Sequence, residues 1–164
     1  MPAKQNIAFT NIILWRHAQA TESPNFVSFE KDLARVLTQK GQKQAKNMAR
    51  WLIQNKTANM QLICSAALRA SETALALQPY MTVNEAFNPG ASLQQVLKAL
   101  AKLEQTKDII LVGHAPWLGQ LAAYLLGVNQ HEFSIKKGAI WWLRTCESVA
   151  SDYKVLTVQT PSLL

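Results

Sequence analysis

Two kinds of hydrophobic pattern alternate along the chain. Short apolar runs typical of buried strands occur at residues 9–15, 61–65, 81–83, 109–112, 139–144 and 153–158. Between them, apolar residues recur every three or four positions, which predicts helices that begin near residues 38, 68, 92 and 116. Neighbouring parallel strands need crossover connections, usually helices. The pattern therefore predicts an α/β fold, a three-layer α/β/α sandwich with a mainly parallel central sheet.

Local signals mark the ends of several predicted helices. Thr38 can cap the first helix, and Ser92 with Gln95 three residues later forms the pattern of a capping box. Pro116 suits a first helical turn, and Gly127 suits a helix end. The helix that begins at residue 68 should stop at residue 78, before a proline. In the first helix, the residues spaced for one buried face are Ala45, Met48, Ala49, Leu52 and Ile53.

Length and composition indicate one globular domain spanning residues 1–164. The chain is 49% hydrophobic, and its apolar stretches fall short of the ~20 residues that a membrane-spanning helix needs. Residues 1–9 lack the apolar core of a secretory signal. The two cysteines, Cys64 and Cys146, have no spacing typical of a zinc site or a redox pair. We therefore expect a cytoplasmic protein without membrane contact.

Positive charge exceeds negative charge along the chain. The sequence has 17 Lys and Arg residues against 10 Asp and Glu residues, a formal net charge of +7. Such a field attracts phosphates, nucleic acids or acidic protein surfaces without choosing among them. Lys40, Lys43, Lys46 and Arg50 fit the solvated side of the first helix. Most tryptophans fall in apolar strand or helix patterns, so we expect no nucleic-acid partner.

Two histidines follow predicted strands at the same offset. Residues 12–18 and 109–115 both consist of an apolar run, two further residues and then His-Ala, which places His17 and His114 just after their strands. In an open α/β sheet, ligands bind outside the carboxyl ends of the strands. The two imidazoles can therefore converge if their strands are near neighbours. The third histidine, His131, lies in a polar stretch, and we expect it to be solvated.

Two arginines give the same edge of the sheet an anion-binding character. Arg16 directly precedes His17, and Arg69 begins the helix after the second strand. A guanidinium can clamp phosphate oxygens through two parallel hydrogen bonds, and a helix N-terminus also favours an anion. A neutral imidazole can attack phosphorus, while two arginines and a second, preferably protonated, histidine stabilise the charge on the oxygens. This set predicts phosphoryl transfer without a metal ion or another cofactor.

Other phosphate chemistries fit the sequence less well. Cysteine-dependent phosphatases have five residues between their cysteine and arginine, whereas four residues separate Cys64 from Arg69. A buried strand position is the better interpretation of Cys64. A Walker-type loop, a dinucleotide fingerprint and a Gly-x-Ser-x-Gly elbow are absent from the sequence.

Taken together, these motifs resemble the histidine phosphatase superfamily, and within it the compact SixA-like phosphohistidine phosphatases. The resemblance implies that His17 is a transiently phosphorylated nucleophile and that Arg16, Arg69 and His114 complete the phosphate pocket. It further implies an α/β/α sandwich and no metal ion. The motifs that carry it, in the order of the family, are Arg16-His17, Leu37-Thr38-x-x-Gly41, the segment from Ser65 to Thr73 with Arg69 inside it, and Gly113-His114.

The same resemblance makes two further residues candidates for substrate binding. Arg35 matches a basic position of the compact branch and is expected to reach a phosphate or an acidic protein partner. Glu85 occupies the segment in which larger relatives place a proton donor, and it is either that acid or a loop carboxylate. An acid contributes roughly 10²- to 10⁴-fold to hydrolysis of an alkyl phosphate. It matters less for a phosphohistidine, because an imidazole leaves readily.

Three functions are compatible with these observations. The leading hypothesis is a phosphatase that removes phosphate from protein phosphohistidine through a covalent phosphohistidine intermediate. The alternatives are a phosphomonoesterase that acts on a small phosphorylated metabolite and a non-catalytic module that binds a phosphorylated partner. The presence of both His17 and His114 argues against a pure binder. Whether residues 19–36 fold over the site is open at this point.

Overall fold

The computed structural model describes residues 7–25, 27–56, 59–129, 131–146 and 149–164, without the side chains of residues 146 and 149–151. The predictions for residues 1–6 and for the Cys146 side chain lie outside this part. In chain order the elements are β1 (Asn11–Arg16), α1 (Phe29–Leu33), α2 (Gln39–Asn55), β2 (Met60–Cys64), α3 (Leu68–Leu75), β3 (Thr82–Val83), the 3₁₀ helix η1 (Glu85–Phe87), α4 (Leu93–Ala101), β4 (Asp108–Gly113), α5 (Trp117–Leu125), β5 (Ile140–Cys146), β6 (Val149–Gln159) and the 3₁₀ helix η2 (Pro161–Leu163).

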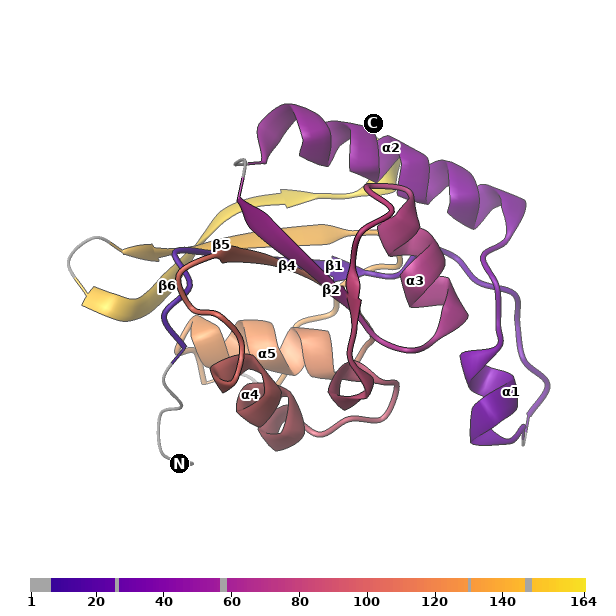
Figure 1. Ribbon diagram of the computed structural model, residues 1–164, viewed down its shortest axis with the longest axis horizontal. Helices are drawn as coiled ribbons and strands as arrows, with labels where there is room; N and C mark the ends of the chain where they lie inside the picture. Colours follow the sequence, from indigo (N-terminus) through magenta and orange to yellow (C-terminus); the bar gives the residue numbers. More distant parts are fainter. Residues whose placement is uncertain (1–6, 26, 57–58, 130, 147–148) are drawn as a thin grey trace.

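Six strands form one sheet in the order β3-β2-β4-β1-β5-β6 (Figure 1). The first four strands of this order are parallel, whereas β5 pairs antiparallel with β1 and β6 pairs antiparallel with β5. The central strands β1 and β4 are apolar and buried along most of their length. Continuous apolar strands are typical of parallel sheets that are covered on both faces. The mainly parallel sheet predicted from the sequence is confirmed, with an antiparallel pair added at one edge.

Helices cover both faces of the sheet, α2 and α3 on one and α4 and α5 on the other (Figure 1). Alternate residues of β1 serve the two layers, because successive side chains of a strand point to opposite faces. Ile12 and Leu14 pack with the core under α4 and α5, while Ile13 and Trp15 pack with the core under α2 and α3. The three-layer α/β/α sandwich is therefore confirmed.

The structure confirms the predicted helix caps at Thr38 and Ser92, whereas the predicted burial of Ile53 and the predicted end of α3 are wrong. The Thr38 side chain accepts a hydrogen bond from the Gly41 amide, and the capping box at Ser92 is complete. The prediction that Ile53 is buried is wrong, since this side chain is 61% exposed. Each helical residue advances by about 100°, so Ile53 lies beyond the edge of the buried stripe. Helix α3 ends at Leu75, three residues earlier than predicted.

The segment between β1 and α2 contains α1 and lies at the end of the molecule where α2 and α3 begin (Figure 1). An isolated antiparallel bridge between Ala20 and Leu37 closes this segment at its base. Helix α1 has five residues, and none of them is buried. Polar contacts rather than core packing must therefore hold it in place. In the described part of the chain, no helix is long and apolar enough to cross a membrane.

Candidate active site

Strands β1 and β4 bring two histidines together. The strands are adjacent and parallel, with Arg16 opposite Gly113, so the next residue of each strand leaves the sheet at the same level. The ring centroids of His17 and His114 lie 5.1 Å apart. Both side chains are buried, with 6% and 2% exposure, while His131 is exposed. The structure thus places side by side the two imidazoles that the equal offsets in the sequence suggested.

His17 is held in one tautomer by its own backbone. Its Nδ1 lies 2.7 Å from the carbonyl oxygen of Ala18. A carbonyl can only accept, so Nδ1 carries the proton and Nε2 keeps its lone pair. Burial, assisted by nearby cations that include Arg69 and Lys137 and opposed by the Ala18 bond, lowers the pKa of His17 to about 3. The ring is therefore neutral at pH 7, which is the nucleophilic form.

His114 is oriented by Ser65, from the loop between β2 and α3. The Ser65 Oγ lies 2.6 Å from His114 Nε2 and also accepts a bond from the Ala67 amide. We assign the hydroxyl as donor to Nε2, which places the ring proton on Nδ1. Burial lowers the pKa of His114 to about 2, and the neighbouring His17 and arginines add to the effect. His114 is therefore neutral here, whereas the sequence argument favoured a protonated ring.

A short segment before β5 is bound to the end of β1. We call this segment, residues 135–139, the strap. Arg16 donates from NH1 to the Ile135 carbonyl at 2.7 Å, and the Gly138 amide donates to the carbonyls of Arg16 and His17. The φ of +78° at Gly138 is in the region that favours glycine. The strap thereby fixes the Arg16 side chain beside His17 and carries Lys137, which is exposed.

Arg69 lies in the first turn of α3 and is only 4% exposed. Its NH1 donates to the Asp32 carbonyl at 2.6 Å, and its NH2 pairs with Asp32 Oδ2 at 2.9 Å. The other carboxylate oxygen of Asp32 accepts from Arg35 NH1 at 3.0 Å. Although burial acts in the opposite direction, hydrogen bonds from Arg35 and Arg69 hold the pKa of Asp32 below its usual range. Arg35 is thus joined to the site through Asp32.

Three buried nitrogens of this cluster lack a hydrogen-bond partner among the described residues. They are Arg16 Nε, Arg69 Nε and His114 Nδ1. A buried donor without an acceptor costs about 1–3 kcal/mol, so native proteins keep such groups mainly where they serve a function. All three can donate to oxygen, and two of them belong to cations. The arrangement is suited to bind an oxyanion beside the free Nε2 of His17.

Two other residues considered from the sequence form no polar contact with the described residues of this cluster. Glu85 is exposed on η1 and forms no hydrogen bond or ion pair with the described residues of the cluster. Its helix is tied to the neighbouring loop through Asn88, whose Oδ1 accepts from the Ala66 amide. Cys64 is buried in β2, and burial raises the pKa of its thiol to about 11. Cys64 is therefore a protonated strand residue, as interpreted from the sequence.

Asp32 and the exposed Lys137 are residues of this site that the sequence analysis did not single out, and Asp32 makes the closer contacts. Its one local signal is its position three residues before Arg35, which makes an i, i+3 ion pair on and just after α1. Its bonds to Arg69 span 37 residues of sequence. No pattern within α1 indicates that contact.

The described residues offer no obvious metal centre. No group of three or more His, Cys, Asp or Glu side chains among them is arranged to hold a metal ion.

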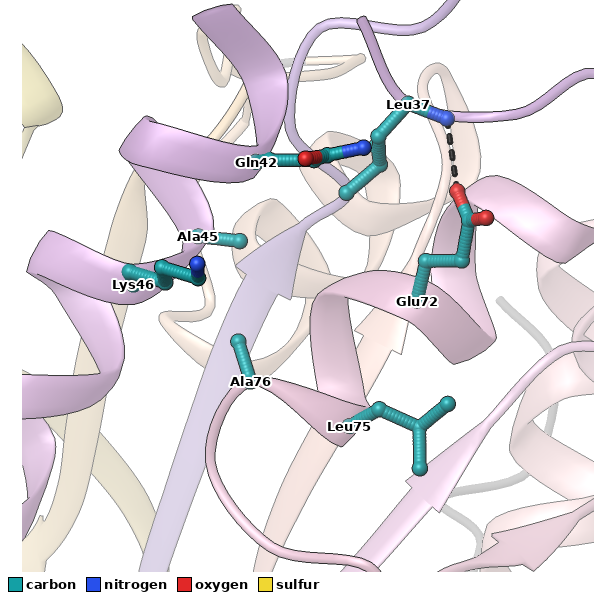
Figure 2. Close-up of a pocket in the computed structure, with 7 residues that line it drawn as sticks. All are labelled: Leu37, Gln42, Ala45, Lys46, Glu72, Leu75 and Ala76. Atoms are coloured by element: carbon teal, nitrogen blue, oxygen red, sulfur yellow. Dashed lines mark hydrogen bonds between the residues drawn. The ribbon is translucent and has the colours of Figure 1, made fainter. Parts of the chain in front are cut away.

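A pocket of about 290 Å³ lies between α2 and α3 (Figure 2), and none of the four residues Arg16, His17, Arg69 and His114 lines it. At its rim, the Glu72 carboxylate accepts a bond from the Leu37 amide at 2.6 Å. We assign Glu72 a structural role there, since its carboxylate fixes the chain just before α2.

Comparisons with known proteins agree with this geometry. Residues 12–87 match the model of the histidine phosphatase superfamily, branch 1. An uncharacterised protein of Picosynechococcus is 32% identical over 142 residues, which is 82% of this chain and 84% of that protein. A phosphohistidine phosphatase SixA homologue of Haemophilus influenzae is 30% identical over 132 residues, 71% of this chain and 77% of its own.

Solved structures show the same fold. The protein histidine phosphatase SixA complexed with tungstate has a TM-score of 0.76 and 21% identity, covering 93% of this chain and 98% of its own. A phosphoserine phosphatase from Entamoeba histolytica in complex with 3-phosphoglyceric acid has a TM-score of 0.67 and 16% identity, covering 93% and 98%. At these identities the likeness concerns the fold alone.

Proposed function

This chain belongs to the histidine phosphatase superfamily, and we propose on that basis that it removes phosphate from phosphohistidine on a protein through a covalent intermediate at His17. The observation that carries the proposal is the state of His17: its Nδ1 is engaged by Ala18, its ring is neutral, and its Nε2 forms no hydrogen bond with the residues that the structure describes. The three unpartnered donors of Arg16, Arg69 and His114 supply binding for the phosphoryl oxygens.

The reaction proceeds in two displacements. In the first, the lone pair of His17 Nε2 attacks phosphorus, and the bond between phosphorus and the substrate nitrogen breaks. Its electron pair returns to the substrate imidazole, which leaves as a neutral ring when its other nitrogen carries a proton. In the second, water attacks the phosphorus of phospho-His17, and the bond to Nε2 breaks with its electron pair returning to Nε2. One proton of the water stays on the new phosphate oxygen, the other passes to solvent, and inorganic phosphate leaves.

The arginines and His114 act on the charge of the phosphoryl group. Arg16 and Arg69 stabilise the negative charge that spreads over the equatorial oxygens in the transition state. His114 donates from Nδ1 in the neutral form, and a bound phosphate dianion favours its protonation because the opposite charge offsets the effect of burial. Removing one such donor typically costs about 10²- to 10³-fold in turnover.

The alternative substrate is a small phosphate ester, as in the phosphoserine phosphatase that shares this fold. When the phosphorus–oxygen bond of an ester breaks, the alcohol portion leaves as an alkoxide, which needs a proton donor. Glu85 is the residue considered for that role, and its side chain forms no hydrogen bond or ion pair with the described residues of the cluster. Because the described residues of the cluster do not hold this carboxyl group in place, a substrate with a phosphorus–nitrogen bond, which needs less help from an acid, fits the site better.

The test compares hydrolysis of phosphoramidate, a phosphohistidine protein and para-nitrophenyl phosphate, all with a chelator present. We expect the wild type to prefer the phosphorus–nitrogen substrates and to trap an acid-labile phosphoenzyme. His17→Asn should lose both properties, while His131→Asn, at the exposed histidine, should keep them. Turnover by His17→Asn at the wild-type rate would overturn the proposal. A selective loss of ester hydrolysis in Glu85→Gln would instead favour the small-molecule alternative.

A further inference from the structure

One carboxylate joins two arginines at the site. Asp32 Oδ2 accepts from Arg69 NH2 at 2.9 Å, its backbone carbonyl accepts from Arg69 NH1 at 2.6 Å, and its Oδ1 accepts from Arg35 NH1 at 3.0 Å. Arg35 is in turn held by the Thr21 carbonyl through its Nε at 2.7 Å. Asp32 thus accepts one bond from each terminal nitrogen of Arg69, and Nε is the nitrogen that lacks any partner among the described residues.

A buried guanidinium needs such a partner. Arg69 is 4% exposed, and an unpaired charge at that depth destabilises a fold strongly. The two bonds that Arg69 donates to Asp32 also fix the plane of the guanidinium, because Arg presents its donors in a rigid fork. The carboxylate and the backbone carbonyl of Asp32 bind the two terminal nitrogens, so Nε can donate to a second acceptor.

The same contacts hold α1. None of its residues is buried, and the bonds between Asp32 and Arg69 join this helix to α3. Two alternatives follow from this geometry. Asp32 either positions Arg69 for the phosphate or occupies Arg69 in place of the phosphate, in which case phosphate must displace it. The free Nε of Arg69 favours the first, since a phosphate oxygen can bind there while both bonds to Asp32 remain.

We propose that Asp32 is a positioning residue that aligns the Arg69 guanidinium for the phosphoryl group, an inference that rests on the proposed phosphatase function. It acts through Arg69 and does not itself touch the phosphorus. Arg35 supports it from the other side of the carboxylate. If Asp32 positions Arg69, loss of the Asp32 charge weakens phosphate binding. If Asp32 instead competed with phosphate for Arg69, loss of its charge would strengthen phosphate binding.

The experiment measures inorganic phosphate binding by calorimetry and turnover of phosphoramidate for Asp32→Asn, Asp32→Glu and Glu30→Gln. Glu30 is the matched control, since it lies on α1, is exposed and forms no side-chain hydrogen bond or ion pair in the described part of the chain. Asp32→Asn should weaken phosphate binding about tenfold, the worth of one charge-assisted hydrogen bond. It should lower kcat by up to about 10²-fold, as a misplacement near 1 Å can. Asp32→Glu, which keeps the charge, should retain more of both, and Glu30→Gln should match the wild type.

Opposite results would overturn the proposal. Tighter phosphate binding in Asp32→Asn would show that Asp32 competes with phosphate for Arg69. Unchanged phosphate binding would show that Asp32 has no role in it. A loss of activity that appears only with a protein substrate, and not with phosphoramidate, would show that Asp32 merely anchors α1. Thermal unfolding of each variant identifies any that does not fold, and Asp32→Glu then carries the test. Phosphate binding requires no turnover, so the two proposals can fail separately. Unchanged phosphate binding in Asp32→Asn would overturn the role of Asp32 without affecting the test of His17, and wild-type turnover by His17→Asn would not affect the phosphate-binding result.

Discussion

Gly41 links the first turn of α2 to the loop that carries the nucleophile, and its replacement by alanine provides a strict test of that link. A Cβ at this position would lie 1.9 Å from the carbonyl oxygen of Gln19. That carbonyl accepts bonds from the amide and the hydroxyl of Thr38, and Gln19 lies two residues after His17. Real Cβ contacts begin near 3.0 Å, so the loop or the helix must move by about 1 Å.

The magnitude follows from two opposing effects. Alanine favours a helix over glycine by about 1 kcal/mol, whereas overpacking costs about 1–3 kcal/mol. We expect Gly41→Ala to lose up to about 2 kcal/mol of unfolding free energy, or roughly 4–8 °C in Tm for a chain of this size. Because a 1 Å displacement near the chemistry can cost about 10²-fold, kcat/KM should fall far more than stability suggests.

Urea unfolding and phosphoramidate turnover measure the two effects. Lys43→Ala, at an exposed position in the same helix, is the control and should change stability by less than about 0.5 kcal/mol. A Gly41→Ala protein that is more stable and fully active would refute the reasoning, because helix propensity alone would then decide the outcome.

Three further predictions concern the site itself. Ser65→Ala should cost about 1–3 kcal/mol in urea unfolding, because it leaves buried His114 Nε2 without its partner; an unchanged midpoint would contradict the assigned network. Lys137→Glu should raise KM for anionic substrates at low salt and lose that effect at high salt, while Lys98→Glu on α4 should not. Burial lowers the pKa of His17 to about 3 and that of His114 to about 2, so below about pH 6.5 the unfolded chain binds more protons and stability falls toward pH 3. His114→Asn should reduce this slope by about 1.4 kcal/mol per pH unit in unfolding measured across that range, and an equal slope would contradict the burial argument.

Features set by neighbouring residues could be predicted from the sequence. The caps at Thr38 and Ser92 depend on contacts three residues away, so their pattern is visible in the chain. The apolar strands before His17 and His114 identified both the sheet and the edge at which these residues lie. Parallel strands end at a common edge, and this geometry allowed the sequence to place two distant histidines near each other.

Other features depended on which segments meet in space. The contact of Asp32 with Arg69 joins residues 37 positions apart, and the bond of Arg16 to Ile135 joins residues 119 apart. The exposure of Ile53 depends on where the buried stripe of α2 meets the sheet. The protonation of His114 depends on its burial among cations, which no local pattern records.

The sequence by itself determined the alternation of strands with the four helices that begin near residues 38, 68, 92 and 116, and the residue types that gather at one edge of the sheet, because short-range hydrogen bonding and hydrophobic periodicity are local properties. Helix α1, none of whose residues is buried, was not predicted. The tertiary structure alone decided which donors lack partners among the described residues, how Asp32 binds Arg69, and which tautomer and protonation state each imidazole has. These features depend on burial and on contacts between segments far apart in the chain.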